Sequence, residues 1–370
     1  MLQVSFTIEI LGEYTDGAVF GESAGGMSIG CLLGSSFRLN NPLGRTLFHK
    51  AIPQSGASLN AVSAHHGEET ARLMAQDLEM DSLISIRNVS LSTLLDATES
   101  VAKSSVRRDD LYGKFMPFQP VVSDDRDPVF KGIDPHVAID KGMARDVKLM
   151  TGINKDEFAL FMMLGMGGES QVLKQGLERE LVVKAMSKRL SGYLNDTSRY
   201  VHVHHHEERA TQLVEEYAPT AAVLSKQQVH QLVEELNSAW LFELPCLRLV
   251  QSQSKYNDVY MYRLDMEAAM PKLKACHALD LPLLFGTWKH PIIGMLTGSD
   301  AKVELISKAM QLAWTSFAKY GVPDAGSLRW PTINNRDPKL LVFEDTGGVT
   351  VAPVPRKLTN SWRGICVSKL

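Results

Sequence analysis

The 370-residue sequence lacks several features that would place it in a specialised class of protein. No window reaches 18 apolar residues, so a transmembrane helix is not expected. The first ten residues lack a basic segment followed by a clean apolar stretch, so they do not resemble a signal peptide. The formal net charge is only −3, which gives no reason to expect nucleic acid or an anionic membrane as a partner.

Cysteine is also scarce, and its four positions show neither paired spacing nor a metal-binding pattern: Cys31, Cys246, Cys276 and Cys366. This favours reduced thiols and a cytoplasmic location. His202 and His206 stand four residues apart in a histidine-rich segment, but the zinc-protease pattern His-Glu-x-x-His is absent. A solvated helix face is therefore favoured over a metal site, and neither a metal nor an organic cofactor is expected.

Segments of strand and helix character alternate along the chain. Residues 147–151, 258–264 and 340–343 read as strands, and residues 303–320 as a helix, with Ile306 and Phe317 among its regularly spaced apolar positions. Such alternation predicts an α/β fold with a mainly parallel sheet flanked by helices. We expect a single domain over residues 1–370, with residues 169–240 forming a helical lid or side wall.

The most informative motif is Gly-Glu-Ser-Ala-Gly at residues 21–25, directly after a short apolar run. It fits Gly-x-Ser-x-Gly, the nucleophile elbow, in which a strand turns sharply into a helix. The turn would lift the Ser23 hydroxyl above the sheet and aim the Ala24 N–H at the place where an oxyanion forms. The alternative is a structural turn with an idle serine.

Together with five further segments, this elbow resembles the type-B carboxylesterase and cholinesterase family of α/β-hydrolases. The segments cover residues 48–57, 118–122, 152–157, 275–282 with 284–286, and 314–321 with 330–331. The resemblance implies the α/β-hydrolase fold and a serine carboxylic-ester hydrolase that acts on a small-molecule ester through an acyl-serine intermediate. A non-catalytic, cholinesterase-like interaction or relic protein is the alternative.

The resemblance also assigns a catalytic triad, with Ser23 as nucleophile, Glu157 as acid and His277 as base, in the chain order of this fold. Glu157 is favoured over Asp156 because it occupies the family's glutamate position. The imidazole would take the serine proton, and the carboxylate would orient the imidazole. We expect these side chains to lie within hydrogen-bonding reach, about 2.6–3.2 Å. Activity should fall below about pH 6.5, where an unperturbed His277 becomes protonated.

Two further residues receive supporting roles from the same resemblance, and a third adjoins the proposed base. Glu22 would either shape the electrostatics of the site or make structural hydrogen bonds, and the sequence leaves both open. Ser55 corresponds to a second serine that lies near the triad. Cys276 precedes the proposed base, where a small buried thiol is favoured over a second nucleophile.

The region ahead of the elbow departs from the family pattern. Family members carry earlier strands and a Gly-rich oxyanion loop reading like His-Gly-Gly-Gly, whereas residues 1–16 contain only Gly12. Loss of one oxyanion donor costs about 10²–10³ in rate. The sequence therefore predicts an N-terminally truncated chain that lacks the N-terminal strands and has impaired activity. Its open sheet edge would permit self-association.

Overall fold

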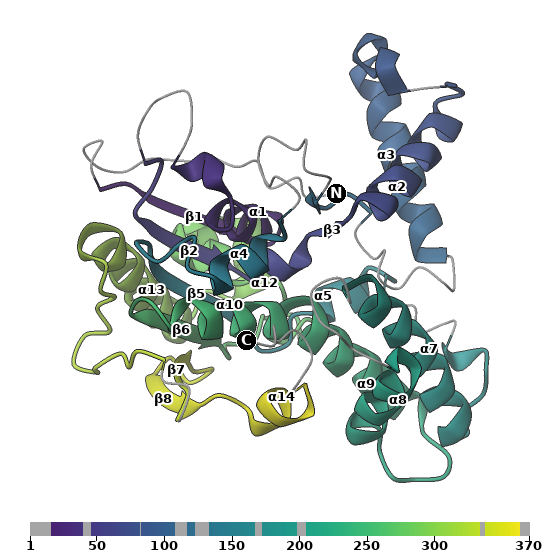
Figure 1. The fold of residues 1–370 in the computed structure, drawn as a ribbon. Coiled ribbons are helices and arrows are strands. Elements are labelled where there is room, and N and C mark those ends of the chain that lie inside the picture. Colours follow the sequence, from purple (N-terminus) through teal and green to yellow (C-terminus); the bar gives the residue numbers. More distant parts are fainter. Residues whose placement is uncertain are drawn as a thin grey trace.

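A computed structural model describes residues 16–39, 46–81, 83–107, 117–122, 133–166, 172–197, 205–333 and 337–362. Its main sheet has the strand order β1-β2-β5-β6-β7-β8 (Figure 1). The strands are β1 (Ala18–Glu22), β2 (Lys50–Gln54), β5 (Lys148–Asn154), β6 (Val259–Leu264), β7 (Lys339–Phe343) and β8 (Val349–Pro353). The first five pair in parallel, and β8 pairs with β7 in the antiparallel direction. The expected mainly parallel sheet is confirmed.

Both faces of this sheet are buried. Ala51 of β2 and Leu149 of β5 belong to one core cluster, while their neighbours Ile52 and Met150 belong to another. Successive side chains of a strand point to opposite faces, so each strand must be apolar at consecutive positions. This explains why the strands appear in the sequence as apolar runs rather than as an alternation of apolar and polar residues.

Helices cover the two faces. On one lie α1 (Ala24–Leu33), α4 (Pro135–Asp140) and α10 (Leu244–Gln253), and on the other α11 (Asp280–Leu284) and α13 (Ala301–Tyr320). All of these except α11 are labelled in Figure 1. The α13 helix begins where Asp300 Oδ1 accepts a hydrogen bond from the Val303 N–H (3.2 Å), and it ends at Gly321 with φ 72°. Ile306 and Phe317, which the sequence periodicity placed on its apolar side, are buried.

The predicted helical region 169–240 contains α7 (Arg179–Thr197), α8 (His206–Tyr217) and α9 (Lys226–Ser238), which lie together at one side of the sheet (Figure 1). Their buried apolar side chains join the same core cluster as those of β5 and α10. The α9 helix continues into α10 through a π-helical turn, Ala239–Glu243.

The remaining elements lie around this framework. They are α2 (Ala64–Asp77), α3 (Leu91–Arg107), α5 (Ala159–Met163), α12 (Pro291–Thr297), α14 (Arg356–Ser361) and a two-stranded parallel pair, β3 (Val62–Ser63) with β4 (Val121–Val122). In Figure 1, α2 and α3 project from the sheet as a pair, with a small apolar core of their own. Neither β8 nor the β3–β4 pair was predicted.

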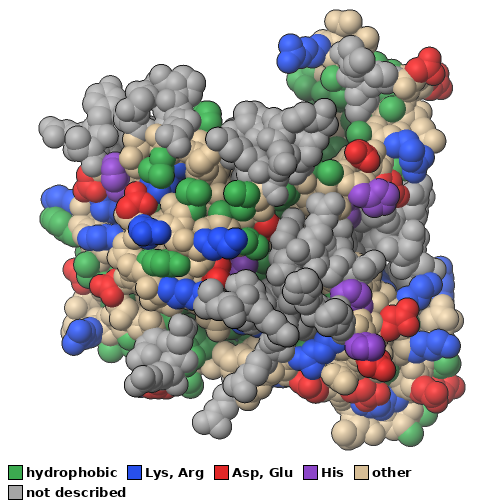
Figure 2. All heavy atoms as spheres, in the orientation of Figure 1, with side chains coloured by type: hydrophobic (Ala, Val, Ile, Leu, Met, Phe, Trp, Pro, Cys, Tyr) green, Lys and Arg blue, Asp and Glu red, His purple; other side chains and the backbone are tan. Residues whose placement is uncertain are grey.

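Acidic and basic side chains are interspersed on the described surface in Figure 2. Within the described ranges, no helix combines the length and apolar character needed to cross a bilayer. In the same ranges, no group of three or more His, Cys, Asp and Glu side chains is arranged to hold a metal ion. His202 and Cys366 lie outside the described residues.

Candidate active site

The elbow forms where β1 ends at Glu22 and α1 begins at Ala24. Ser23 between them has φ 55°, a left-handed conformation that is costly for a residue with a Cβ. Its N–H donates to the Gln54 carbonyl of β2 (2.9 Å). A Cβ on Gly26 would lie 2.6 Å from that same carbonyl oxygen, so α1 can sit this close to β2 only with glycine there.

The Ser23 side chain is half-buried, and Ala24 is exposed. Ala24 is the first residue of α1, and the first N–H groups of a helix have no acceptor within the helix. The Ala24 N–H, next in sequence to Ser23, is therefore one of these N-terminal groups.

Glu157 and His277 lie side by side although 120 residues separate them. His277 Nδ1 is 2.6 Å from Glu157 Oε2. The other oxygen, Glu157 Oε1, accepts hydrogen bonds from the Ser55 hydroxyl (2.6 Å) and the Asn154 N–H (2.8 Å). The Glu157 side chain is fully buried, so these contacts fix its orientation.

The neighbouring acid, Asp156, has a different set of contacts. Its N–H donates to the Ala275 carbonyl (3.0 Å), and its Oδ2 accepts from the Ala275 N–H (3.3 Å). Asp156 thus ties the loop after β5 to the loop that carries His277. Of the two acids that the sequence offered, Glu157 is the one in contact with the imidazole.

The other imidazole nitrogen faces Glu22. His277 Nε2 lies 3.2 Å from Glu22 Oε1, outside hydrogen-bond geometry. Among the described residues, neither Nε2 nor the Glu22 oxygens have a hydrogen-bond partner. The structure therefore contains the expected contact between Glu157 and His277, but no hydrogen bond between Ser23 and His277.

Burial and charge both act on the ionisation of this cluster. Burial raises the pKa of Glu22 to about 8, despite the opposing effect of His277. Burial alone would lower the pKa of His277, but Glu22 and then Glu157 outweigh it and raise that pKa to about 9. Because Glu22 exerts this effect only while ionised, the two groups titrate as a coupled pair. The expectation of an unperturbed His277 with a pKa near 6.5 is therefore wrong.

A third acid near this pair was not singled out from the sequence. Asp280 Oδ2 accepts hydrogen bonds from Gln54 Nε2 (2.6 Å) and from the Tyr262 hydroxyl (3.1 Å). Asp280 is fully buried, and burial raises its pKa. Its position three residues after His277 was the available signal, because it places an acid in the same loop as the base.

Two aromatic rings pack against His277. The Phe242 and His277 ring centroids are 4.7 Å apart, and those of Phe161 and His277 are 5.2 Å apart. The two phenylalanine rings also stack on each other, at 5.8 Å. The imidazole is thus confined by apolar surfaces as well as by carboxylates.

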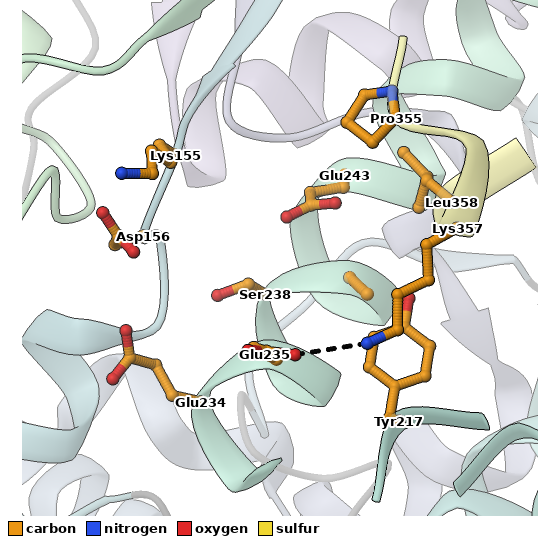
Figure 3. Close-up of a pocket in the computed structure, with 11 residues that line it drawn as sticks. Lys155, Asp156, Tyr217, Glu234, Glu235, Ser238, Glu243, Pro355, Lys357 and Leu358 are labelled. Carbon is orange, nitrogen blue, oxygen red and sulfur yellow. Dashed lines mark hydrogen bonds and ion pairs between the residues drawn. The ribbon is translucent and has the colours of Figure 1, made fainter. Parts of the chain in front are cut away.

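A cavity of about 190 Å³ lies behind the loop that carries Glu157. Figure 3 shows Lys155 and Asp156 on one side, with Ser238 and Glu243 of the helical segment opposite. Burial raises the pKa of Glu243 to about 7. No residue of the elbow lines this cavity, whereas Asp156, the alternative acid, does.

Cys276 is a free, buried thiol. Burial raises its pKa to about 12, so the thiolate required of a nucleophile is disfavoured. This agrees with the interpretation of Cys276 as a packing residue.

The sequence is similar to a known protein family and to several of its members. Residues 15–358 match the model of the Carboxylesterase family. Para-nitrobenzyl esterase of Bacillus subtilis (strain 168) is 27% identical over 88% of this chain and 58% of its own length. Acylcarnitine hydrolase of Mus musculus is 27% identical over 86% of this chain and 52% of its own.

The fold is also similar to that of solved carboxylesterase structures. One structure of a PNB esterase superposes with a TM-score of 0.69 at 26% identity, over 95% of this chain and 62% of that one. A Geobacillus stearothermophilus carboxylesterase gives 0.67 at 27% identity, over 95% of this chain and 65% of that one. The predicted α/β-hydrolase fold is confirmed. The chain spans little more than half the length of the curated relatives that it matches.

Proposed function

The chain belongs to the carboxylesterase family, and we propose that it is a serine hydrolase of small carboxylic esters. In this proposal Ser23 is the nucleophile, His277 the general base and Glu157 the acid that orients His277. Ala24 contributes an oxyanion donor, Ser55 holds the acid, and Glu22 shapes the electrostatics of the base. The observation that carries the proposal is the buried contact of 2.6 Å between Glu157 and His277 beside a left-handed serine elbow.

The chemistry follows from these positions. Glu157 accepts the Nδ1–H of His277, which leaves Nε2 free to take the Ser23 proton as the hydroxyl attacks the ester carbonyl. The resulting oxyanion accepts a hydrogen bond from the Ala24 N–H. His277 then returns the proton to the leaving alcohol, an acyl-Ser23 ester remains, and water releases the acid by the same route.

The contact between Glu22 and His277 must be broken before this mechanism can operate. His277 can act as base only when Nε2 is unprotonated and turned to Ser23, whereas in the structure it faces Glu22. We propose that substrate binding or a rise in pH releases Nε2 from Glu22.

The missing hydrogen bond between Ser23 and His277 also favours the second candidate, a non-catalytic binding protein of the same fold. A fluorophosphonate probe separates the two, since it reacts covalently only with an activated serine. We expect a single adduct by mass spectrometry that is absent in Ser23→Ala, together with hydrolysis of 4-nitrophenyl acetate. A chain that folds but yields no adduct between pH 7 and 10 would support the second candidate, a non-catalytic protein.

Three further properties are part of this proposal. We propose that helices α7–α9 within residues 169–240 serve as a lid or side wall of the site. The outer edge of β1, which pairs only with β2 among the described strands, is proposed to mediate self-association. The buried free thiols favour a cytoplasmic location. Light scattering across a dilution series tests the association, since a molecular mass independent of concentration at one chain would refute it.

A further inference from the structure

The helical segment that carries Phe242 is irregular, and the sequence explains why. Between α9 and α10, residues Ala239–Glu243 form a π-helical turn, and the Leu244 N–H donates to the Ala239 carbonyl five residues earlier. Pro245 follows at the start of α10. In a regular α-helix residue 245 would donate its N–H to the Leu241 carbonyl, but proline has no N–H.

A side chain from another part of the fold meets that carbonyl. Asn60 Nδ2 donates to the Leu241 carbonyl (3.0 Å), across 181 residues of sequence. The Asn60 Oδ1 accepts from the Ala57 N–H (3.0 Å), so the two ends of the amide are distinguished by their partners. Asn60 is only 6% exposed, and it lies five residues after Ser55, which holds Glu157.

The π-helical turn contacts His277, and the residue before the turn bonds to the residue that follows Glu157. Phe242 is fully buried and packs against the His277 ring at 4.7 Å. At the start of the turn, the Ser238 hydroxyl accepts a hydrogen bond from the Phe158 N–H (3.0 Å), directly after Glu157. A displacement of this turn would therefore move a wall of the imidazole site.

The other side of the turn is not closely packed. Ser238, Ala239 and Glu243 line the cavity of about 190 Å³, which separates them from Lys155 and Asp156 (Figure 3). The cavity is partly open to solvent and offers space beside the turn. Phe242 itself is fully buried, and the hydrogen bond from Asn60 to the Leu241 carbonyl adds a directional constraint to its packing.

We infer that Asn60 is a positioning residue for His277: its amide holds the Leu241 carbonyl and so keeps the π-helical turn, with Phe242, against the imidazole. The inference rests on the proposed role of His277 as base. Its primary readout, however, is the environment of His277 and not the turnover of substrate.

The test compares Asn60→Ala with Gln253→Ala. Gln253 is a matched control, because its buried amide also donates to backbone carbonyls, those of Ala144 and Val147 (both 2.7 Å). NMR of ¹⁵N-histidine-labelled protein, with His277→Gln for assignment, follows the His277 Nδ1 proton and its titration. We expect Asn60→Ala to move that resonance and the titration midpoint, and Gln253→Ala to leave both unchanged.

A double-mutant cycle tests whether Asn60 acts on His277 through Phe242. If Asn60 acts through Phe242, Asn60→Ala should have no further effect on the His277 signal in a Phe242→Ala background. Additive effects would overturn the inference, as would equal His277 spectra in Asn60→Ala and the parent chain. Should Asn60→Ala fail to fold, Asn60→Asp serves instead, since it keeps the acceptor for Ala57 and loses the donor to Leu241.

Kinetics add a second readout in the active chain. Small displacements of reacting groups can cost about 10²-fold in rate, so we expect a loss of about that size in kcat with KM little changed. An Asn60→Ala variant that loses rate while its His277 spectrum stays native would refute the inference and leave the proposed function intact. Absence of turnover in the parent chain would refute the proposed function and leave the NMR comparison decisive.

Discussion

Glu22 Oε1 lies 3.2 Å from His277 Nε2, the nitrogen that would have to receive the Ser23 proton. The Nδ1 side of the same ring is 2.6 Å from Glu157. The imidazole is therefore placed between two carboxyl groups, and the one on the Nε2 side competes with the hydroxyl that the mechanism needs. This relationship governs how the protein should respond to pH.

Activity should increase with pH through the alkaline range. Below its raised pKa of about 9, His277 is largely protonated and cannot act as base. Removing the carboxylate with Glu22→Gln should lower that pKa, so the rising limb of the profile should move to lower pH and activity at pH 7 should increase. The measurement is kcat/KM for 4-nitrophenyl acetate from pH 5 to 10. An unchanged midpoint in Glu22→Gln would contradict the coupling.

Glu157→Gln should reduce kcat by about 10³–10⁴-fold. In a serine triad, replacing the acid by its amide favours the wrong imidazole tautomer, a loss of about this size in serine proteases. Asp156→Asn is the control, because Asp156 contacts Ala275 and not the imidazole; we expect less than about a 10-fold change there. Comparable losses in both variants would show that loop structure, and not the contact with His277, was affected.

Stability should fall as pH rises from about 5 to 9. Glu22 has an ordinary pKa of 4.5 and a raised one of about 8, and for His277 the values are 6.5 and about 9. Both folded-state values are raised, so the folded chain binds more protons than the unfolded chain throughout this window. Their contribution is complete below about pH 4.5 and is lost as pH rises through about 9. Urea midpoints at pH 5, 7 and 9 check this, and the slope should be shallower in Glu22→Gln.

Gly26→Ala should destabilise the fold by about 1–3 kcal/mol, the usual range for overpacking a close contact. The new Cβ would meet the Gln54 carbonyl at 2.6 Å, and a backbone atom cannot move aside without separating α1 from β2. Ser28→Ala, in the same helix and half-buried, should change the free energy of unfolding by less than about 0.5 kcal/mol. Equal urea midpoints for the two variants would show that α1 can shift freely.

The sequence predicted those parts of the fold that depend on local pattern. Helix α13 was predicted from apolar periodicity, strands β5 and β6 from short runs of strand character, and the position of the elbow from its glycines. The same residues could not reveal β8, whose side chains are largely exposed and whose pairing depends on β7. Residues that act at a distance, such as Asn60 and Phe242, gave no local signal, because their role depends on contacts across more than 30 residues.

The site was predictable to a similar extent. The resemblance of their loops to the carboxylesterase family selected Glu157 and His277, which the structure brings together. It could not predict that Glu22 would approach Nε2, because that contact depends on how β1 and the His277 loop meet in three dimensions. For the same reason, the pKa expected for an isolated histidine did not apply.

Three residues around the site, Ser23, Ser55 and Ala278, have φ between 49° and 64°, although none is glycine. Each non-glycine residue in this conformation costs roughly 1–2 kcal/mol. Only Ala278 has a side chain without a polar group, so glycine could replace it and relieve this cost without removing a donor or acceptor. The loop next to His277 would then gain freedom as the fold gained stability. At position 278, glycine would therefore favour thermal stability, whereas alanine favours a fixed position of His277.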